Sequence, residues 1–330
     1  MTRPPTTEVL QVAYRTMRTI RSFEEALVAL VTQGRLGGFL HTYVGQEAIA
    51  AAVCAHLGEH DHVASTHRGH GHCIAKGVDV RGMMAELFGR RTGTCGGRGG
   101  SMHIADLGKG MLGANGIVGA GIPLATGAAL TAKLKRTGGV AVAFFGDGAS
   151  NQGAFHESLN MAANWSLPAV YVCENNGWGE FTPTAFVVPV KDIAERARAY
   201  AMHALIADGM DFFDVYAQAG EAIARARGGA GPSLLECKTY RFLGHYVGDP
   251  LVYRAKHEAD DWIRHRDPLR LFEARVTREG LLTESNLRAI DVDVAALVAD
   301  AVARAQDAPF PDAGELLHGV FATSDAEGAR

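Results

Sequence analysis

The sequence lacks the features that mark membrane, secreted and nucleic-acid-binding proteins. No apolar run approaches the ~18 to 20 residues that span a bilayer, and the first residues, MTRPPTTEVLQ, have no apolar core of a secretory signal. Charged residues make up 21% of the chain and the net charge is only −4, which leaves no basic surface for nucleic acid. These absences predict a cytoplasmic globular protein with neither a nucleic-acid nor a membrane partner.

The sequence contains few cysteines, and their spacing shows no sign of pairing. The 5 cysteines are an odd number and include no CxxC pair, which favours reduced thiols over a disulfide framework or a cysteine-based zinc knuckle. A histidine-rich stretch before Cys73 leaves zinc open as an alternative, although no Cys or carboxylate partner set accompanies it. Its members are His41, His56, His60, His62, His67, His70 and His72.

Two motifs stand out among the residues that are present, each directly after a short apolar run. GDGASNQG begins at Gly146 after VAVAFF, and CENNGWG begins at Cys173 after LPAVYV. Continuous apolar runs of this length are typical of strands buried on both faces of a parallel sheet. The small residues Gly148 and Ala149 let the backbone approach a phosphate at the edge where open α/β sheets bind ligands.

The same motifs place oxygen-bearing side chains at two strand ends. Asp147 follows the first strand and Asn176 the second, with room between them for one helix and one strand. Carboxylate and amide oxygens suit Mg²⁺, which also takes oxygens from substrate phosphates. Either motif alone could merely form a turn. Together, in this order and at this spacing, they predict a magnesium and diphosphate site.

The order of expected elements favours an α/β fold, a doubly wound parallel sheet with helices on both faces. Helices are expected over residues 7–33, 46–57, 81–88, 122–135, 150–164, 192–202 and 211–227, and strands over residues 62–65, 140–145, 167–174, 203–209 and 232–240. We divide the chain into an N-terminal helical segment (1–34), a diphosphate-binding α/β domain (35–267) and a helical tail (268–330) that packs on the domain or on a partner.

Glycine is abundant, with 40 in the chain, and many of them crowd the stretch from Gly89 to Gly127. A flexible linker is one interpretation of such a stretch. Interspersed arginines, Met102, His103 and Asn115 instead favour a loop that is ordered around a ligand.

The two motifs resemble the thiamine-diphosphate signature of transketolase-like and 2-oxo acid dehydrogenase enzymes. Further stretches are similar to the alpha subunit of the decarboxylating component of pyruvate, branched-chain 2-oxo acid and acetoin dehydrogenase complexes. The matching stretches are GFLHTYVGQEA from Gly38, STHRGHG from Ser65, GGRGGSMH from Gly96, NGIVGAGIP from Asn115 and YRFLGHYVGDP from Tyr240. The likeness covers roughly residues 9–267.

The resemblance implies thiamine diphosphate and Mg²⁺ as cofactors. It implies that Asp147, Asn176 and the main chain at Trp178 hold the metal, and that Gly116 and Val118 meet the aminopyrimidine ring. Arg68 is expected to hold diphosphate oxygens. His67 could donate to a phosphate, although the family usually has tyrosine at that position. The candidates for acid–base work and substrate contact are His41, His70 and His245, of which His245 is also expected to contact the cofactor.

The resemblance also implies partners. The chain offers no second sheet and no glutamate segment to activate the cofactor ring, so a beta subunit is expected to complete the site in an α2β2 heterotetramer. A lipoyl-bearing acyltransferase would take the acyl group from a small carbonyl substrate. ENNGWGEFTP and GHYVGDP favour acetoin slightly, with pyruvate and branched-chain 2-oxo acids as alternatives.

Two alternatives of other classes stay open. One is a noncatalytic assembly or regulatory paralogue, which intact Asp147, Asn176, Arg68 and His245 disfavour. The other is a nucleotide-binding oxidoreductase, but no GxGxxG lies between a strand and a helix with an acidic residue about 20 positions later.

Overall fold

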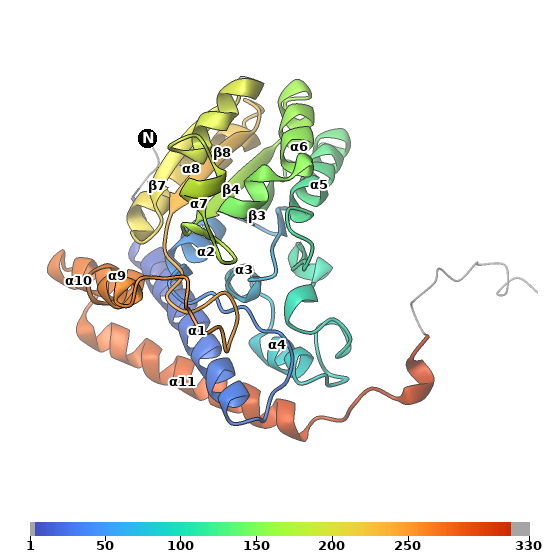
Figure 1. Ribbon diagram of the computed structural model, residues 1–330, viewed down its shortest axis with the longest axis vertical. Coiled ribbons are helices and arrows are strands. Elements are labelled where there is room, and N and C mark those ends of the chain that lie inside the picture. The colour runs from blue at the N-terminus through green and yellow to red at the C-terminus, as the bar shows by residue number, and fades with distance from the viewer. Residues whose placement is uncertain (1–3, 318–330) are drawn as a thin grey trace, which may run out of the picture.

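Six parallel strands form the central sheet of the computed structural model, which describes residues 4–317 (Figure 1). Their spatial order is β2-β1-β3-β4-β8-β7, so the strand order reverses between β1 and β3. Open parallel sheets bind ligands beyond the carboxyl ends of the strands at such a reversal. The strands are β1 (His62–Ala64), β2 (Met111–Gly113), β3 (Ala141–Gly146), β4 (Ala169–Asn175), β7 (His203–Asp208) and β8 (Ser233–Lys238).

The two central strands are buried on both faces, as their apolar runs predict. Along β3, Ala143 and Phe145 face one core while Val142 and Phe144 face the other. The register pairs Gly146 of β3 with Glu174 of β4, so these two strands end at the same level. The residues that follow them are therefore brought to one edge of the sheet.

One face of the sheet is covered by helices rich in small residues. These are α5 (Gly121–Lys135), α6 (Gly153–Asn164) and the 3-10 helix η4 (Ile193–Tyr200), which pack on Ala141, Tyr171 and Leu234. In Figure 1, α5 and α6 lie together on the side of the sheet away from α8.

The opposite face carries the larger core. Its central helices are α1 (Thr7–Thr32), α2 (Glu47–Cys54), α3 (His70–Ala75), α4 (Val80–Leu87) and α8 (Phe212–Arg227). The C-terminal helices α9 (Glu258–Arg266), α10 (Pro268–Arg278) and α11 (Glu284–Asp307) follow, and α11 lies along α1 and α4 (Figure 1). The helical tail thus packs on the same core as the N-terminal helix.

The α/β class and most expected elements are confirmed, with differences at short elements. The structure adds α3, β2 and α9, as well as a small hairpin of β5 (Trp178–Gly179) and β6 (Thr182–Pro183) that leads into α7 (Thr184–Val187). The helix expected over residues 192–202 is present as the 3-10 helix η4 (Ile193–Tyr200). The helix expected from residue 150 begins at Gly153, because the 3-10 turn η3 (Asp147–Asn151) precedes it. Two further short 3-10 turns are η1 (Ser101–His103) and η2 (Leu107–Lys109), and another, η5 (Ala313–Glu315), lies near the end of the described chain.

Residues 1–3 and 318–330, the outer ends of the expected N-terminal segment and tail, lie outside the described residues. The division into three segments stays a prediction. Within residues 4–317, no helix combines the length and apolar character that a membrane crossing needs.

Candidate functional site

A cavity of about 510 Å³ lies beyond the carboxyl ends of β1, β3 and β4, at the reversal of strand order. Side chains or backbone from segments far apart in the sequence line it. Eleven of the residues expected at the site are among them: His41, His67, Arg68, Gly116, Val118, Asp147, Gly148, Ala149, Asn176, Trp178 and His245. The sheet topology therefore brings together the positions that the two motifs and the histidine-bearing loops single out.

Asp147 and Asn176 stand where the apolar runs place them, directly after β3 and at the end of β4. Both are buried, and each is held by hydrogen bonds. The Thr184 hydroxyl donates to Oδ2 of Asp147, and Nδ2 of Asn176 donates to Oε1 of Gln46 at 3.0 Å. The backbone N–H of Trp178 donates to Oδ1 of Asn176 at 3.1 Å. The two candidate ligands are therefore fixed in position, and their oxygens keep further lone pairs for a cation.

Burial governs the charge state of Asp147. Loss of solvent around its carboxyl raises the pKa to about 6, although backbone N–H groups and Arg241 oppose the shift. A buried carboxylate without a full counter-charge is the type of group that a bound cation stabilises.

Two arginines bring positive charge to the same cavity. Arg68 is 4% exposed, and its guanidinium donates to the backbone oxygen of Thr42 at 2.5 Å and to that of His245 at 3.0 Å. Arg241 is 1% exposed, and its buried Nε has no hydrogen-bond partner within the described part of the chain. Burial, followed by repulsion from Arg241, lowers the pKa of Arg68 to about 9. Such a pair of buried cations favours an anionic ligand.

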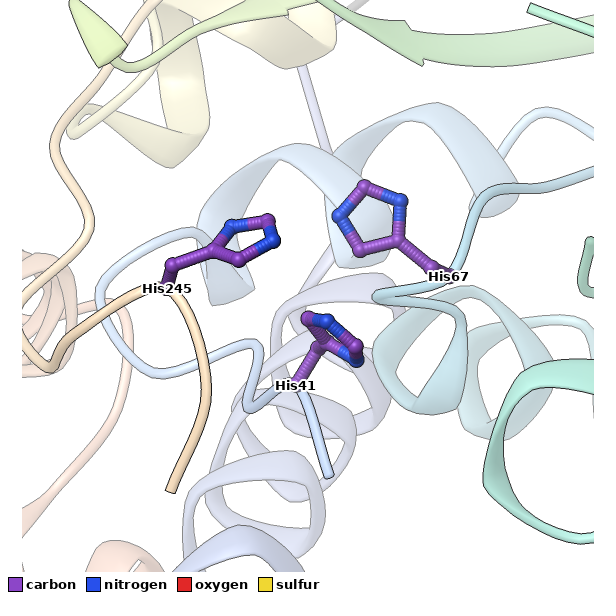
Figure 2. A group of neighbouring side chains, drawn as sticks. All are labelled: His41, His67 and His245. Carbon is purple, nitrogen blue, oxygen red and sulfur yellow. The ribbon is translucent and has the colours of Figure 1, made fainter. Parts of the chain in front are cut away.

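Three histidines form a cluster on one wall of the cavity. Figure 2 shows His41, His67 and His245 facing one another from three different loops. Their ring centroids lie 4.7 to 5.4 Å apart. Burial and the nearby arginines lower the pKa of His41 to about 3, that of His67 to about 2 and that of His245 to about 4. All three rings are therefore neutral near pH 7.

His70, the remaining candidate, does not line the cavity. It is fully buried at the start of α3, where Nδ1 lies 3.1 Å from the Glu24 carboxylate and Nε2 lies 2.9 Å from the Ser101 hydroxyl. The residue ties α1 to the glycine-rich segment. Any influence of His70 on chemistry in the cavity would therefore be indirect.

The sequence analysis did not single out several residues that line the cavity. Arg241 sits in the YRFLGHYVGDP stretch, four positions before His245, so its place in the same stretch as that candidate could have singled it out. Glu174 precedes the two asparagines and joins a buried network beneath the cavity. It accepts a hydrogen bond from the Tyr43 hydroxyl and lies 3.1 Å from Nε2 of His72. Sequence spacing gives no signal for that network.

The glycine-rich segment is ordered mainly around a protein carboxylate. Glu86 is fully buried, and its two oxygens accept four backbone N–H groups at 2.7 to 3.0 Å, from Cys95, Gly97, Gly99 and Gly100. Gly97 and Gly100 adopt positive φ, so glycine permits the turns that aim these donors inward. The segment also contributes Met102 and residues 115–119 to the cavity wall. The segment is thus ordered in the structure, and its ordering around a ligand stays a prediction.

Replacing Glu86 with glutamine should destabilise the fold. The amide would turn a donor toward backbone N–H groups and leave two of them unpaired in the interior, so we expect a loss of about 3 to 5 kcal/mol in the free energy of unfolding. Denaturant titration measures this loss. The exposed residue Glu59 supplies the matched control, Glu59→Gln. Equal stability of the two variants would contradict the assignment.

Comparison with known proteins agrees with this geometry. The family model described as "Dehydrogenase E1 component" matches residues 14–314. The acetoin:2,6-dichlorophenolindophenol oxidoreductase alpha subunit of Bacillus subtilis (strain 168) is 52% identical over 96% of this chain and 94% of its own length. The protein of the same name from Cupriavidus necator is also 52% identical, over 95% of this chain and 94% of its own.

A relative named for a different substrate is more distant. The pyruvate dehydrogenase E1 component alpha subunit of Rhizobium meliloti (strain 1021) is 43% identical over 94% of this chain and 89% of its own. Because the family model and all three relatives span nearly the whole chain, the likeness includes the strand ends, the glycine-rich segment and the tail. The chain belongs to the dehydrogenase E1 component family.

Proposed function

We propose that the chain is the alpha subunit of a thiamine-diphosphate-dependent dehydrogenase that cleaves a carbon–carbon bond next to a carbonyl and passes the acyl group to a lipoyl group. The observation that carries this proposal is the cavity itself. It combines oxygen ligands at two adjacent strand ends with two buried arginines and three histidines. A diphosphate needs this pairing of a metal site with fixed positive charge.

The residues present fit the cofactor. The free Nε of Arg241 and the crowded positive charge of Arg68 and Arg241 suit diphosphate oxygens. The backbone of Gly148 and Ala149 passes the cavity without bulky side chains, which permits close approach of a phosphate. Asp147, Asn176 and the main chain at Trp178 would hold Mg²⁺. Gly116 and Val118 lie on the glycine-rich side, where the aminopyrimidine would rest.

When bound, thiamine diphosphate supplies a carbon nucleophile and an electron sink, and the chain supplies binding, orientation and proton handling. His41 and His245 would donate hydrogen bonds to substrate oxygen as neutral imidazoles, since their pKa values lie near 3 and 4. An anion in the cavity raises these pKa values by attraction, which would bring the rings closer to acid–base use. Asp249 anchors the His245 loop by accepting the backbone N–H of His245 at 2.6 Å.

The surface around the cavity supports a beta-subunit partner. Ile117, Val118 and Phe39 line the cavity yet expose much of their apolar area, and Ile117 is 72% exposed. Apolar side chains clustered at a site entrance mark a protein contact. We propose that a beta subunit covers this rim in an α2β2 heterotetramer and that a lipoyl-bearing acyltransferase reaches the cavity past the His245 loop.

Acetoin is the favoured substrate, because the two relatives at 52% identity carry acetoin in their names and the pyruvate relative is more distant. The test is turnover by the chain co-expressed with a beta subunit, thiamine diphosphate and Mg²⁺, with dichlorophenolindophenol as electron acceptor. Acetoin, pyruvate and 3-methyl-2-oxobutanoate are compared by kcat/KM. A preference for pyruvate or the branched acid would overturn the substrate assignment. Cofactor binding without any turnover would favour the noncatalytic alternative.

The pH dependence of metal binding should report the ionisation of Asp147. Its pKa of about 6 is raised above the ordinary value, so the carboxylate that a cation needs disappears as the pH falls through 6. We expect Mg²⁺ affinity in the presence of cofactor to be flat above about pH 7 and to fall about tenfold per pH unit below about pH 5.5. Calorimetry from pH 5 to 8 measures this slope, after subtraction of the titration of the free cofactor. A flat profile would contradict the assignment.

A further inference from the structure

The histidine cluster has a geometry that a bound anion alone does not require. The ring nitrogens of His41, His67 and His245 that could each ligate one ion all lie within 4.8 Å of one another. The three residues come from the loops before α2, after β1 and after β8, so the fold gathers them from separate parts of the chain (Figure 2).

The hydrogen bonding of the cluster is incomplete. His41 is only 3% exposed, yet its buried Nδ1 has no partner among residues 4–317, and no carboxylate belongs to the group. Burial and positive neighbours keep the rings unprotonated near pH 7, which is the form that ligates metals. A buried imidazole without a hydrogen bond in a cluster of neutral imidazoles indicates room for a ligand.

We propose that His41, His67 and His245 form a site for a divalent transition-metal ion, represented by Zn²⁺, in the cofactor-free chain, and that this ion and the cofactor diphosphate exclude each other. Imidazole nitrogen suits Zn²⁺, Ni²⁺ and Cu²⁺, whereas Mg²⁺ prefers oxygen. The site is therefore distinct in chemistry from Asp147 and Asn176. The exclusion rests on the proposed function, but metal binding to the histidines does not.

Modest rotation of the rings completes the geometry. Zn–N bonds of about 2.0 to 2.1 Å in a tetrahedral site bring ligand nitrogens to about 3.3 Å from one another, which is closer than the outer limit of 4.8 Å in the cluster. The fourth position would open to the cavity and take water. Such an open three-histidine site accepts a further ligand, as catalytic zinc sites do.

Positive charge near the cluster sets the strength of the site. Arg68 and Arg241 face the histidines and disfavour a cation, and Nη1 of Arg241 lies 3.4 Å from Nδ1 of His245. Glu24 and Glu174 act on Arg68 in the opposite direction and offset part of its field. Asp249 does the same for His245. The ion is thus held by coordination bonds against a net repulsion. The cofactor would displace it by occupying the space beside His67 and His245, the two rings of the cluster that are expected to contact the cofactor.

The experiment titrates the full cofactor-free chain with Zn²⁺ by calorimetry, and with Co²⁺ by visible absorption, at pH 7. We expect one ion per chain and the intense visible bands of tetrahedral Co²⁺. His41→Ala and His67→Tyr should each weaken binding at least tenfold. His257→Ala should change nothing, because the His257 side chain is 72% exposed and belongs neither to the cluster nor to the cavity lining. Equal binding by wild type and both cluster variants would overturn the proposal.

A second titration separates this site from the proposed function. Saturation with thiamine diphosphate and Mg²⁺ should abolish the tetrahedral Co²⁺ bands of the wild type. If the cofactor binds by calorimetry and the bands persist, the exclusion is wrong. If the cofactor fails to bind even to the chain co-expressed with its beta subunit, while the histidine-dependent bands appear, the proposed function fails and the metal site stands.

Discussion

Replacing Asp147 with asparagine is expected to weaken Mg²⁺-dependent binding of thiamine diphosphate by at least about 100-fold. Outer-shell changes at metal sites already cost about 10- to 100-fold, and this change removes the only carboxylate among the proposed ligands. The asparagine keeps the shape of the side chain and one oxygen. Any loss of cofactor affinity therefore measures the contribution of the negative charge. Fluorescence or calorimetric titration of the cofactor, with and without Mg²⁺, measures the change.

The stability of the same variant distinguishes a lost ligand from a damaged fold. Because burial raises the pKa of Asp147 to about 6, the ionised carboxylate destabilises the folded state above that pH, and the penalty vanishes as the pH falls below about 4. The neutral amide should therefore leave the cofactor-free chain at least as stable at pH 8, with a gain of up to about 3 kcal/mol. Asp307→Asn, at the exposed end of α11, is the control. Unchanged cofactor affinity in the Asp147 variant would remove the metal assignment.

The central part of the fold is predictable because two strands bury both faces. The apolar runs ending at Phe145 and Val172 are typical of strands between two helical layers, and the parallel register then brings Asp147 and Asn176 to one edge. The order of the strands in the chain and their parallel direction are enough to place these two side chains near each other. The end of the cavity that Asp147 and Asn176 line is therefore accessible to sequence reasoning.

The structure of the glycine-rich segment could not be predicted from the sequence. The three-residue strand β2 has too few residues for periodicity, and its place at the sheet edge depends on pairing with β1. Glu86 looks like an ordinary helix residue in sequence, yet it organises the whole segment through four backbone N–H groups. Contacts between a side chain and a distant backbone leave no pattern in residue types.

The histidine cluster could be predicted from the sequence only in part. The richness of histidine before Cys73 is visible in the sequence, but the structure selects only His41 and His67 from that stretch and adds His245 from nearly 180 residues later. Other members of the stretch are used elsewhere, such as His72, which stacks on Phe144 at 3.8 Å between ring centroids. The histidine-rich stretch in the sequence therefore predicted neither which histidines form the cluster nor how they are arranged.

Replacing Arg241 with methionine is expected to change ligand binding and stability in opposite directions. The Arg241 side chain is 1% exposed, its Nε lacks a hydrogen-bond partner among the residues that the structure describes, and its charge lowers the pKa of Arg68. Loss of one charged hydrogen bond to diphosphate, worth about 1.5 to 3 kcal/mol, should weaken cofactor binding about 10- to 150-fold. Methionine fills much of the same volume without the charge.

The cofactor-free chain should tolerate this change well, because removing one of two buried, mutually repelling cations offsets the lost hydrogen bonds to the Glu180 carbonyl and the Tyr253 hydroxyl. We expect its melting temperature to be unchanged or higher, while the rise in melting temperature on adding cofactor and Mg²⁺ shrinks. Arg288→Met on the exposed face of α11 is the control. A variant that melts at a lower temperature yet binds cofactor with wild-type affinity would show that Arg241 stabilises the loop and does not bind the cofactor. A ligand-binding role predicts the opposite result, with lower cofactor affinity and an unchanged or higher melting temperature.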